Sequence, residues 1–256
     1  MAAVVGGLDP ALFALAVVVT LVASFVKGAV GFAMPMIMIS GLGSFLPAEV
    51  ALAALILPTV FTNISQSLRQ GWREAARSVL RYWRMIGMIA LCIALSAQLV
   101  RFIPQAAFYA LLGGPIMLFA VVQLVGWQPV IPTANRARAE VITGVVAGLY
   151  GGISGIWGPP VLVYLLSVGA GKQENIRVQG VVFLIGAVVL TGAHLHSGVL
   201  NAGSAGLSAA LVIPAMAGLW LGYRVQDRLD AVRFRRWTLV VLAVTGVNLI
   251  RRALTV

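Results

Sequence analysis

One pair of glycines recurs at a fixed distance along this chain. Gly28 and Gly31 reappear as Gly155 and Gly158, 127 residues further on. Self-similarity at a fixed spacing is the sequence signature of a unit that occurs more than once. The spacing therefore predicts that the chain consists of two copies of one ancestral unit, which constrains every fold that it can adopt.

Positive charge is not copied together with the glycines. The first copy has a basic run between its third and fourth apolar segments, whereas the equivalent stretch 197–203 has no Lys or Arg. The basic run consists of Arg69, Arg73, Arg77, Arg81 and Arg84. One connection later the bias reverses, since the first copy has Arg101 and the second has five arginines within 224–236. Lys and Arg mark the cytoplasmic side of a membrane protein, so the two copies are predicted to have opposite orientations.

This interpretation divides the chain into three parts. They are a first inverted repeat over 1–126, a cytoplasmic connector over 127–138 and a second inverted repeat over 139–256. Because each copy has an odd number of segments, the connector and the connection 169–177 fall on the side of the basic run, with both termini outside. Inverted repeats are typical of secondary transporters.

Composition excludes a water-soluble domain. The chain is 61% hydrophobic and 10% charged, more apolar surface than a soluble core can bury. The net charge of +11 lies in short connections, where it indicates topology and contacts with membrane lipids rather than nucleic acid. Cys92 is the only cysteine, so the sequence predicts no disulfide and no cysteine metal site. We expect no cofactor and no metal ion, and we leave a homo-oligomer open.

The fold class predicted from the apolar runs is an all-α polytopic membrane protein with about five helical segments in each repeat. The segments are 11–27, 32–46, 48–68, 79–100, 104–125, 139–154, 158–169, 176–196, 204–223 and 234–250. The second segment of each set is short and follows a glycine break. Each repeat therefore opens with a helix broken at a glycine-rich re-entrant turn. The fourfold spacing of the arginines within 69–81 predicts a short helix lying in the membrane interface.

Two breaks at equivalent positions are the best pointer to a substrate site. Backbone exposed by a break cannot face lipid, so it lines protein or a cavity. A helix that starts after the break offers free amides and its positive dipole end to an anion. Lys27, beside the first break, is the one ionised side chain well inside an apolar stretch and would neutralise that anion. The alternatives are close packing for the glycines and snorkelling to the interface for Lys27.

Polar residues inside the apolar segments complete the predicted site. Thr59, Thr62, Asn63 and Gln66 form one stripe of a helix, and interhelical hydrogen bonding explains such residues as well as substrate contact does. The predicted substrate-binding residues are Lys27, Gly28, Gly31, Phe32, Asn63, Gln66, Ser154, Gly155, Trp157, Gly158, Pro159 and Thr191. His194 is the candidate for relaying a coupled proton, with a merely structural polar role as the alternative.

One enzyme motif has to be weighed. The stretch 152–155 (GISG) matches the G-x-S-G of rhomboid-type intramembrane proteases, and His194 could serve Ser154 as its base. The chain has only two histidines, and the first copy has no serine at the equivalent place. We therefore expect no enzyme, and the protease stays an alternative.

The breaks and their surroundings resemble those of the sulfite exporter TauE/SafE family of permeases. The resemblance lies in the stretch 27–35 (KGAVGFAMP), the stretch 151–160 (GGISGIWGPP) at the second break, followed by Tyr164, and the turn 70–72 (QGW). It extends over about 12–252. The first break departs from the family's glycine-rich run at Lys27, Phe32 and Met34. The resemblance implies a permease of the bacterial cytoplasmic membrane for small anions such as sulfite, sulfonates, sulfoacetate or other organic acids, coupled to a proton gradient.

These observations together predict a secondary transporter that moves a small anion across the inner membrane by alternating access. Its partners would be that anion and membrane lipids. The alternative within transport is an uncoupled, channel-like anion conduit.

Overall fold

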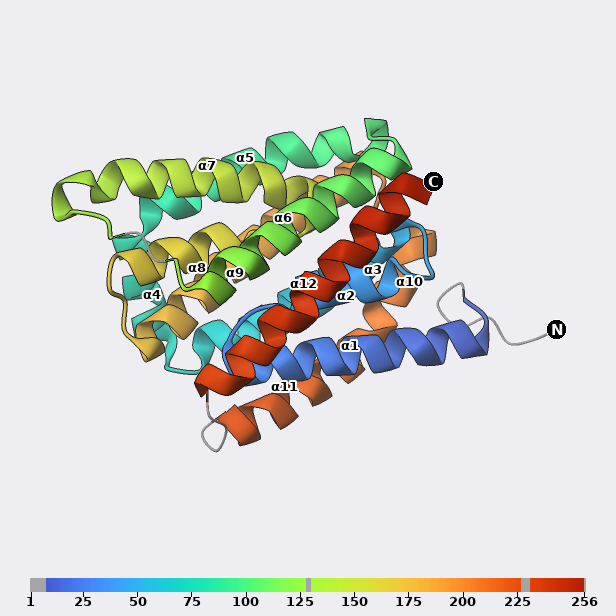
Figure 1. Ribbon diagram of the computed structural model, residues 1–256, viewed down its shortest axis with the longest axis horizontal. Helices are drawn as coiled ribbons and strands as arrows, with labels where there is room; N and C mark the ends of the chain where they lie inside the picture. Colours follow the sequence, from blue (N-terminus) through green and yellow to red (C-terminus); the bar gives the residue numbers. More distant parts are fainter. Residues whose placement is uncertain (1–7, 128–129, 227–230, 256) are drawn as a thin grey trace.

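The computed structural model describes residues 8–127, 130–226 and 231–255, and these residues form helices and connections with no β-strand (Figure 1). The helices before the connector are α1 (Pro10–Val30), α2 (Met34–Leu42), α3 (Ala48–Leu68), α4 (Trp72–Arg81), α5 (Trp83–Ser96), the 3₁₀ helix η1 (Ala97–Phe102) and α6 (Gln105–Val125). Those after it are the 3₁₀ helix η2 (Thr133–Asn135), α7 (Arg136–Ser154), α8 (Gly158–Ser167), α9 (Lys172–Ser197), α10 (Ala202–Ala210), α11 (Val212–Gln226) and α12 (Ala231–Thr255).

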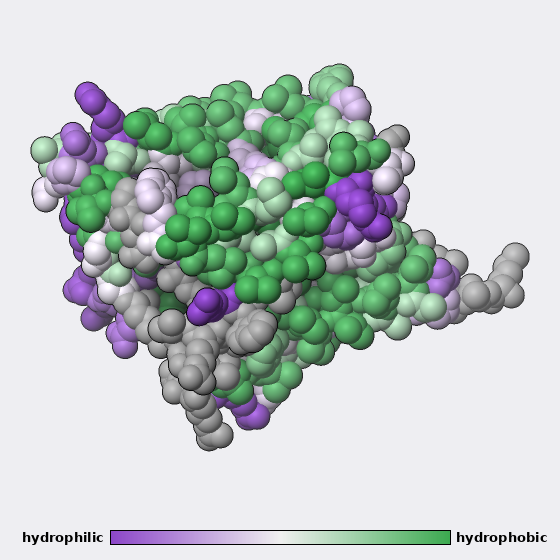
Figure 2. Space-filling model, in the orientation of Figure 1, coloured by the Kyte–Doolittle hydropathy of each residue, from purple (hydrophilic) through white to green (hydrophobic). Residues whose placement is uncertain are grey.

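Seven helical segments of the described residues are long and apolar enough to cross a membrane. Apolar residues cover most of the face seen in Figure 2, and hydrophilic residues gather toward its two ends. Large apolar side chains such as Val18, Leu118 and Val244 are more than half exposed, as side chains that face lipid are expected to be. The predicted all-α, multi-span fold is confirmed to this extent.

The predicted segments differ from the helices in detail. The first helix does not end before Gly28 but continues to Val30, so the first break lies at residues 31–33. The predicted segment 204–223 is one apolar span over 202–226 that is interrupted at Leu211, between α10 and α11. The basic run contains α4, which confirms the short helix predicted from its arginine spacing.

Each of the main helix pairs joins a helix from before the connector to one from after it. α1 packs along α11, α5 along α7, α6 along α12 and α3 along α9 (Figure 1). The first and second halves of the chain therefore interleave in one bundle instead of forming two separate domains. Both α1 and α12 have their terminal ends on the same side of this bundle, opposite α4.

Glycines allow two of these pairs to approach closely. A Cβ atom placed on Gly222 of α11 would lie 2.7 Å from the Cα atom of Gly28 and would press on the carbonyl oxygen of Phe25. In the other pair, a Cβ on Gly148 of α7 would lie 2.8 Å from the carbonyl oxygen of Ile89. Small residues of this kind let membrane helices pack backbone against backbone. Gly28 therefore serves the crossing of α1 and α11.

Candidate functional site

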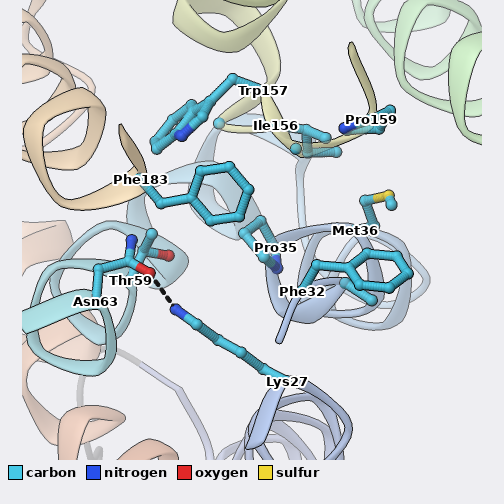
Figure 3. A pocket seen from close by; sticks show the side chains of 13 residues that line it. Lys27, Phe32, Pro35, Met36, Thr59, Asn63, Ile156, Trp157, Pro159 and Phe183 are labelled. Atoms are coloured by element: carbon cyan, nitrogen blue, oxygen red, sulfur yellow. Dashed lines mark hydrogen bonds between the residues drawn. The ribbon is translucent and has the colours of Figure 1, made fainter. Parts of the chain in front are cut away.

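The two chain breaks line the same cavity (Figure 3). Residues of the break between α1 and α2 lie on one side of it, residues of the break between α7 and α8 on another, and α3 and α9 complete the wall. The lining residues are Lys27, Phe32, Ala33, Pro35, Met36, Thr59, Asn63, Gly155, Ile156, Trp157, Gly158, Pro159 and Phe183. Segments that are more than 120 residues apart in the sequence thus meet at one place.

Left-handed backbone produces both breaks. Gly31 ends α1 with φ 88°, and its amide donates to the carbonyl of Lys27 at 2.7 Å. Ala33, which follows, has φ 79° and is the one residue other than glycine with positive φ in the described chain. Gly155 ends α7 in the same way with φ 70°. Side chains other than glycine rarely adopt this conformation, and strained backbone of this kind clusters at ligand sites.

Lys27 is a buried cation without an anionic partner. Its side chain is 1% exposed, and the Nζ atom donates to Thr62 Oγ1 at 2.9 Å and to Asn63 Oδ1. None of the ion pairs among the described residues includes Lys27. A buried charge is costly unless it is paired, so this ammonium group lacks the negative partner that a buried cation requires.

Two further donors on the cavity wall have no acceptor. Asn63 Nδ2 and Trp157 Nε1 are both buried and form no hydrogen bond within the described residues. Together with Lys27 these residues line one cavity, and no carboxylate lines it. Buried donors are nearly always satisfied, so unpaired donors that share a cavity indicate a missing acceptor. The arrangement suits an anion with several oxygen atoms.

Aromatic side chains keep the cavity narrow. Phe183 packs edge-on against Trp157 with the ring centroids 6.2 Å apart, and in Figure 3 it lies between Trp157 and the Lys27–Asn63 pair. Phe32 makes a similar edge-on contact with Phe119 at 6.2 Å. The cavity volume is about 20 Å³, which is room for about one water molecule. An oxyanion requires these side chains to move apart.

Several predicted site residues lie at the breaks but use their polar atoms elsewhere. Gln66 Nε2 donates to the carbonyl of Gly31 at 2.9 Å and to that of Ile176 at 3.1 Å, so it braces the first break. Ser154 Oγ donates to the carbonyl of Tyr150 at 2.7 Å and accepts from the amide of Ile156 at 3.0 Å, which caps α7. Both contacts hold the geometry of the breaks.

Other predicted residues lie away from the lining. Thr191 Oγ1 donates to the carbonyl of Ala187 in its own helix at 2.7 Å. His194 is fully buried, and its Nδ1 atom is 3.2 Å from Ser197 Oγ. The lining residues that the sequence did not single out are Ala33, Pro35, Met36, Ile156 and Phe183. Apolar residues inside apolar helices carry no signal that separates a cavity wall from ordinary core.

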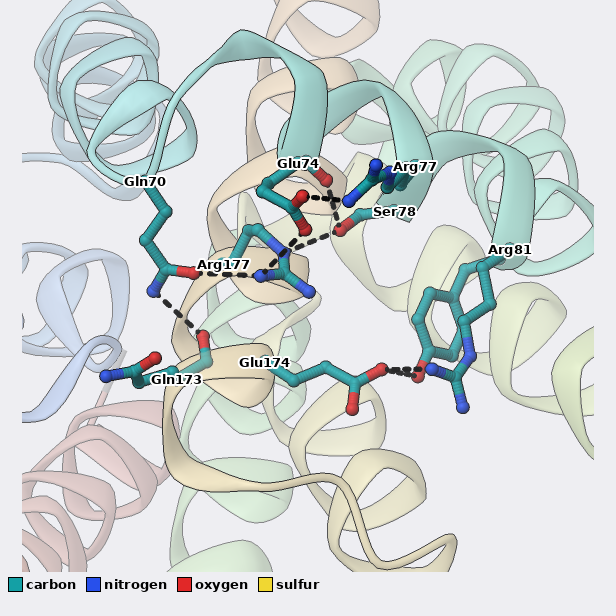
Figure 4. Close-up of polar contacts among 9 residues, drawn as sticks. Gln70, Glu74, Arg77, Ser78, Arg81, Gln173, Glu174 and Arg177 are labelled. Carbon is teal, nitrogen blue, oxygen red and sulfur yellow. Dashed lines mark hydrogen bonds and ion pairs between the residues drawn. The ribbon is translucent and has the colours of Figure 1, made fainter.

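Polar contacts join the C-terminal end of α3 and α4 to the start of α9 (Figure 4). Gln70 Nε2 donates to the carbonyl of Gln173 at 3.1 Å, and Arg177 donates to Gln70 Oε1 at 2.9 Å. Arg177 also pairs with Glu74 at 3.5 Å. Arg136 at the end of the connector donates to the carbonyl of Val168 at 3.1 Å. The prediction that the basic run, the connector and the connection 169–177 share one end of the molecule is confirmed by these contacts.

Comparison with known protein families gives a match over nearly the whole chain. The family described as Sulfite exporter TauE/SafE matches residues 16–249. No curated protein and no solved structure gives a significant match.

Proposed function

Since the chain belongs to the sulfite exporter TauE/SafE family of membrane transporters, we propose that it moves a small anion across the bacterial cytoplasmic membrane by alternating access. The proposed substrates are sulfite, a sulfonate such as sulfoacetate, or another small organic acid. The observation that carries this proposal is that Lys27 and two residues with unpaired donors, Asn63 and Trp157, line one cavity without a carboxylate.

The helix pairing supports two inverted repeats, bounded as 1–126 and 139–256 around the connector 127–138. With the offset of 127 residues, α1 corresponds to α7, α5 to α11, α3 to α9 and α6 to α12. Exchanging the two halves turns the α1–α11 pair into the α7–α5 pair and returns the α3–α9 and α6–α12 pairs unchanged. Halves related by a pseudo-twofold axis produce such a pattern.

The distribution of charge supports a cytoplasmic position for the end that carries α4. The basic run, Arg136, Arg177 and Arg224 belong to this end, whereas the opposite end has Arg101 and the pair 251–252. The positive-inside rule then places both termini outside.

The narrow cavity supports alternating access over an open conduit. Space for about one water molecule beside a Lys27 side chain that is 1% exposed agrees with a closed form of a carrier. A channel-like conduit would require a continuous wet path. To transport an anion, a closed form must open its contacts on one side at a time. The contacts that would open are those between α3 and α9 and those at the two chain breaks.

The protease alternative is wrong, because the family consists of transporters. The geometry agrees with this correction. Ser154 is engaged with Tyr150 and Ile156, and no hydrogen bond joins it to His194 among the described residues.

Ligand binding to purified protein tests the proposal directly. We expect sulfite, methanesulfonate or sulfoacetate to raise the apparent melting temperature, because a ligand that binds only the folded form stabilises it. Chloride serves as the control anion. In proteoliposomes, accumulation of the same anion against its gradient under an imposed proton gradient supports a coupled carrier. Purely downhill flux would favour the uncoupled conduit, and the absence of both effects for every anion would overturn the proposal.

Replacing Trp157 by phenylalanine is expected to weaken anion binding by about tenfold. The change keeps the aromatic wall but removes the indole N–H, and a hydrogen bond to a charged group contributes about 1.5–3 kcal/mol. Trp220→Phe is the matched control, because that ring is 54% exposed on α11. Calorimetric titration with the anion that gives the largest thermal shift measures both variants. Equal affinities in the two variants would remove Trp157 from the site.

A further inference from the structure

The described chain has a second buried charge that the anion site does not use. Among the Lys, Arg, Asp and Glu side chains whose burial the structure describes, only those of Lys27 and Glu140 are less than a tenth exposed, at 1% and 7%. Glu140 lies in the second turn of α7, on the face that continues through Gly144 and Gly148 along α5. An ionisable side chain buried between the helices of a membrane protein is expensive and therefore indicates a function.

The carboxyl group of Glu140 has only one hydrogen bond. Tyr164 of α8 donates to Oε1 at 3.2 Å, while Oε2 is buried and has no partner within the described residues. None of their ion pairs includes Glu140. Arg136, one turn earlier in α7, donates through Nη2 to the carbonyl of Val168, while its buried Nε has no partner within the described residues and its charge acts on Tyr164 and Tyr82. A buried carboxylate that forms no ion pair and has one unpaired oxygen is a costly charge.

The groups around Glu140 lead from it toward water. Tyr164 meets Tyr82 edge-on at 6.3 Å, and Tyr82 donates to Glu174 Oε1 at 3.0 Å. Glu174 is 23% exposed and pairs with Arg81 at 2.8 Å at the basic end (Figure 4). Burial, together with the hydrogen bond to Glu174, raises the pKa of Tyr82 to about 12, so Tyr82 remains a neutral donor. From α5, the side chain of Met88 and the backbone carbonyl of Met85 lie against this face of α7 at Gly144, one turn after Glu140.

Glu140 is connected to the anion cavity through α8. This helix is ten residues long, begins with the cavity-lining residues Gly158 and Pro159, and carries Tyr164 further along. The hydrogen bond between Tyr164 and Glu140 ties α8 to α7, and the break at 155–157 is the turn between those helices. A change of charge at Glu140 therefore acts on the element that forms one wall of the cavity.

The two buried charges are opposite in sign, and neither forms an ion pair within the described residues. An anion beside Lys27 neutralises the first, and a proton on Glu140 neutralises the second. A carrier loaded with both has no unpaired buried charge among these residues, so it rearranges within the membrane at least cost. We propose that Glu140 is a proton-binding site, and that one proton is taken up there with each anion bound beside Lys27. This inference rests on the proposed function.

Proton uptake on anion binding tests the proposal. Methanesulfonate has no titrating group near neutral pH, so it is added to purified protein in weakly buffered detergent solution containing a pH indicator. Sulfite is the second probe, with its own titration subtracted by using the Lys27→Met variant as the blank. We expect the wild type to take up close to one proton per anion bound. Glu140→Gln is expected to bind the anion and take up no proton, whereas Glu174→Gln, which alters the partly exposed carboxylate of the same cluster, keeps the uptake.

The possible outcomes separate this proposal from the proposed function. Anion binding by the wild type without proton uptake, or equal uptake by Glu140→Gln, overturns the role of Glu140 and leaves the anion site intact. Failure of the wild type to bind either probe overturns both. If Glu140→Gln does not fold, Glu140→Asp keeps the acid, and infrared difference spectra on anion addition should then show a shifted carboxylic C=O band. If the carboxylic C=O band of Glu140→Asp is the same as that of the wild type, the proton binds to another group and the proposal is wrong.

Discussion

Replacing Lys27 by methionine is expected to lower the affinity for the transported anion by more than about 100-fold. The change removes the one cation on the cavity wall while keeping a long side chain of similar volume. Truncating one partner of a buried, hydrogen-bonded charge pair costs about 3 kcal/mol, which corresponds to this loss of affinity. Calorimetric titration of purified protein with sulfite or methanesulfonate measures it.

A stability measurement separates loss of the site from loss of the fold. Without an anion, the buried ammonium group of Lys27 is bound only by Thr62 and Asn63, so its removal should not lower the melting temperature of the ligand-free protein. Arg73→Met is the control, because Arg73 is an exposed arginine of α4 and its loss should leave both affinity and stability unchanged. If Lys27→Met and Arg73→Met bind the anion equally well, the anion does not sit beside Lys27.

The position of the cavity could be predicted from the sequence because it follows from where the helices are interrupted. Interrupted helices leave backbone groups that lipid cannot satisfy, and the repeated glycines marked both interruptions. Lys27 and Asn63 could be found for a similar reason, since polar groups inside apolar helices must face inward. The structure brings these two residues and Trp157 to one cavity.

The role of each remaining residue could not be predicted because the same residue type serves two purposes. The sequence predicts that Gly28 belongs to the first break, yet it lies inside α1, where the backbones of α1 and α11 are in contact. The hydroxyl groups of Ser154 and Thr191 satisfy carbonyls of their own helices, a local choice that spacing does not reveal. Glu140 stands near Arg136 and Arg138 in the sequence, where a carboxylate looks like part of a solvated, charged helix end.

The other large effect is expected at the crossing of α1 and α11. Gly222→Ala should destabilise the fold by roughly 3 kcal/mol, because the added methyl group meets the backbone of Phe25 and Gly28 rather than a side chain that could turn away. The two helices must separate to relieve this clash. Because α1 carries Lys27 and leads directly into the first break, their separation also disturbs the cavity. The expected result is a large loss of monodisperse protein in detergent, with a lower melting temperature and weaker anion binding in what remains.

Gly206→Ala is the matched control for this prediction. Gly206 lies in α10, the neighbouring helix of the same span, and no atom lies within 4 Å of a Cβ placed on it. Alanine favours a helix over glycine by about 1 kcal/mol, so this variant should melt at the wild-type temperature or slightly above it. The two substitutions add the same methyl group to adjacent helices. Gly222→Ala is nevertheless expected to lower the melting temperature, and Gly206→Ala to keep or raise it. A Gly222→Ala protein as stable as Gly206→Ala would mean that α1 and α11 are not in backbone contact, and that Lys27 is positioned by something other than this crossing.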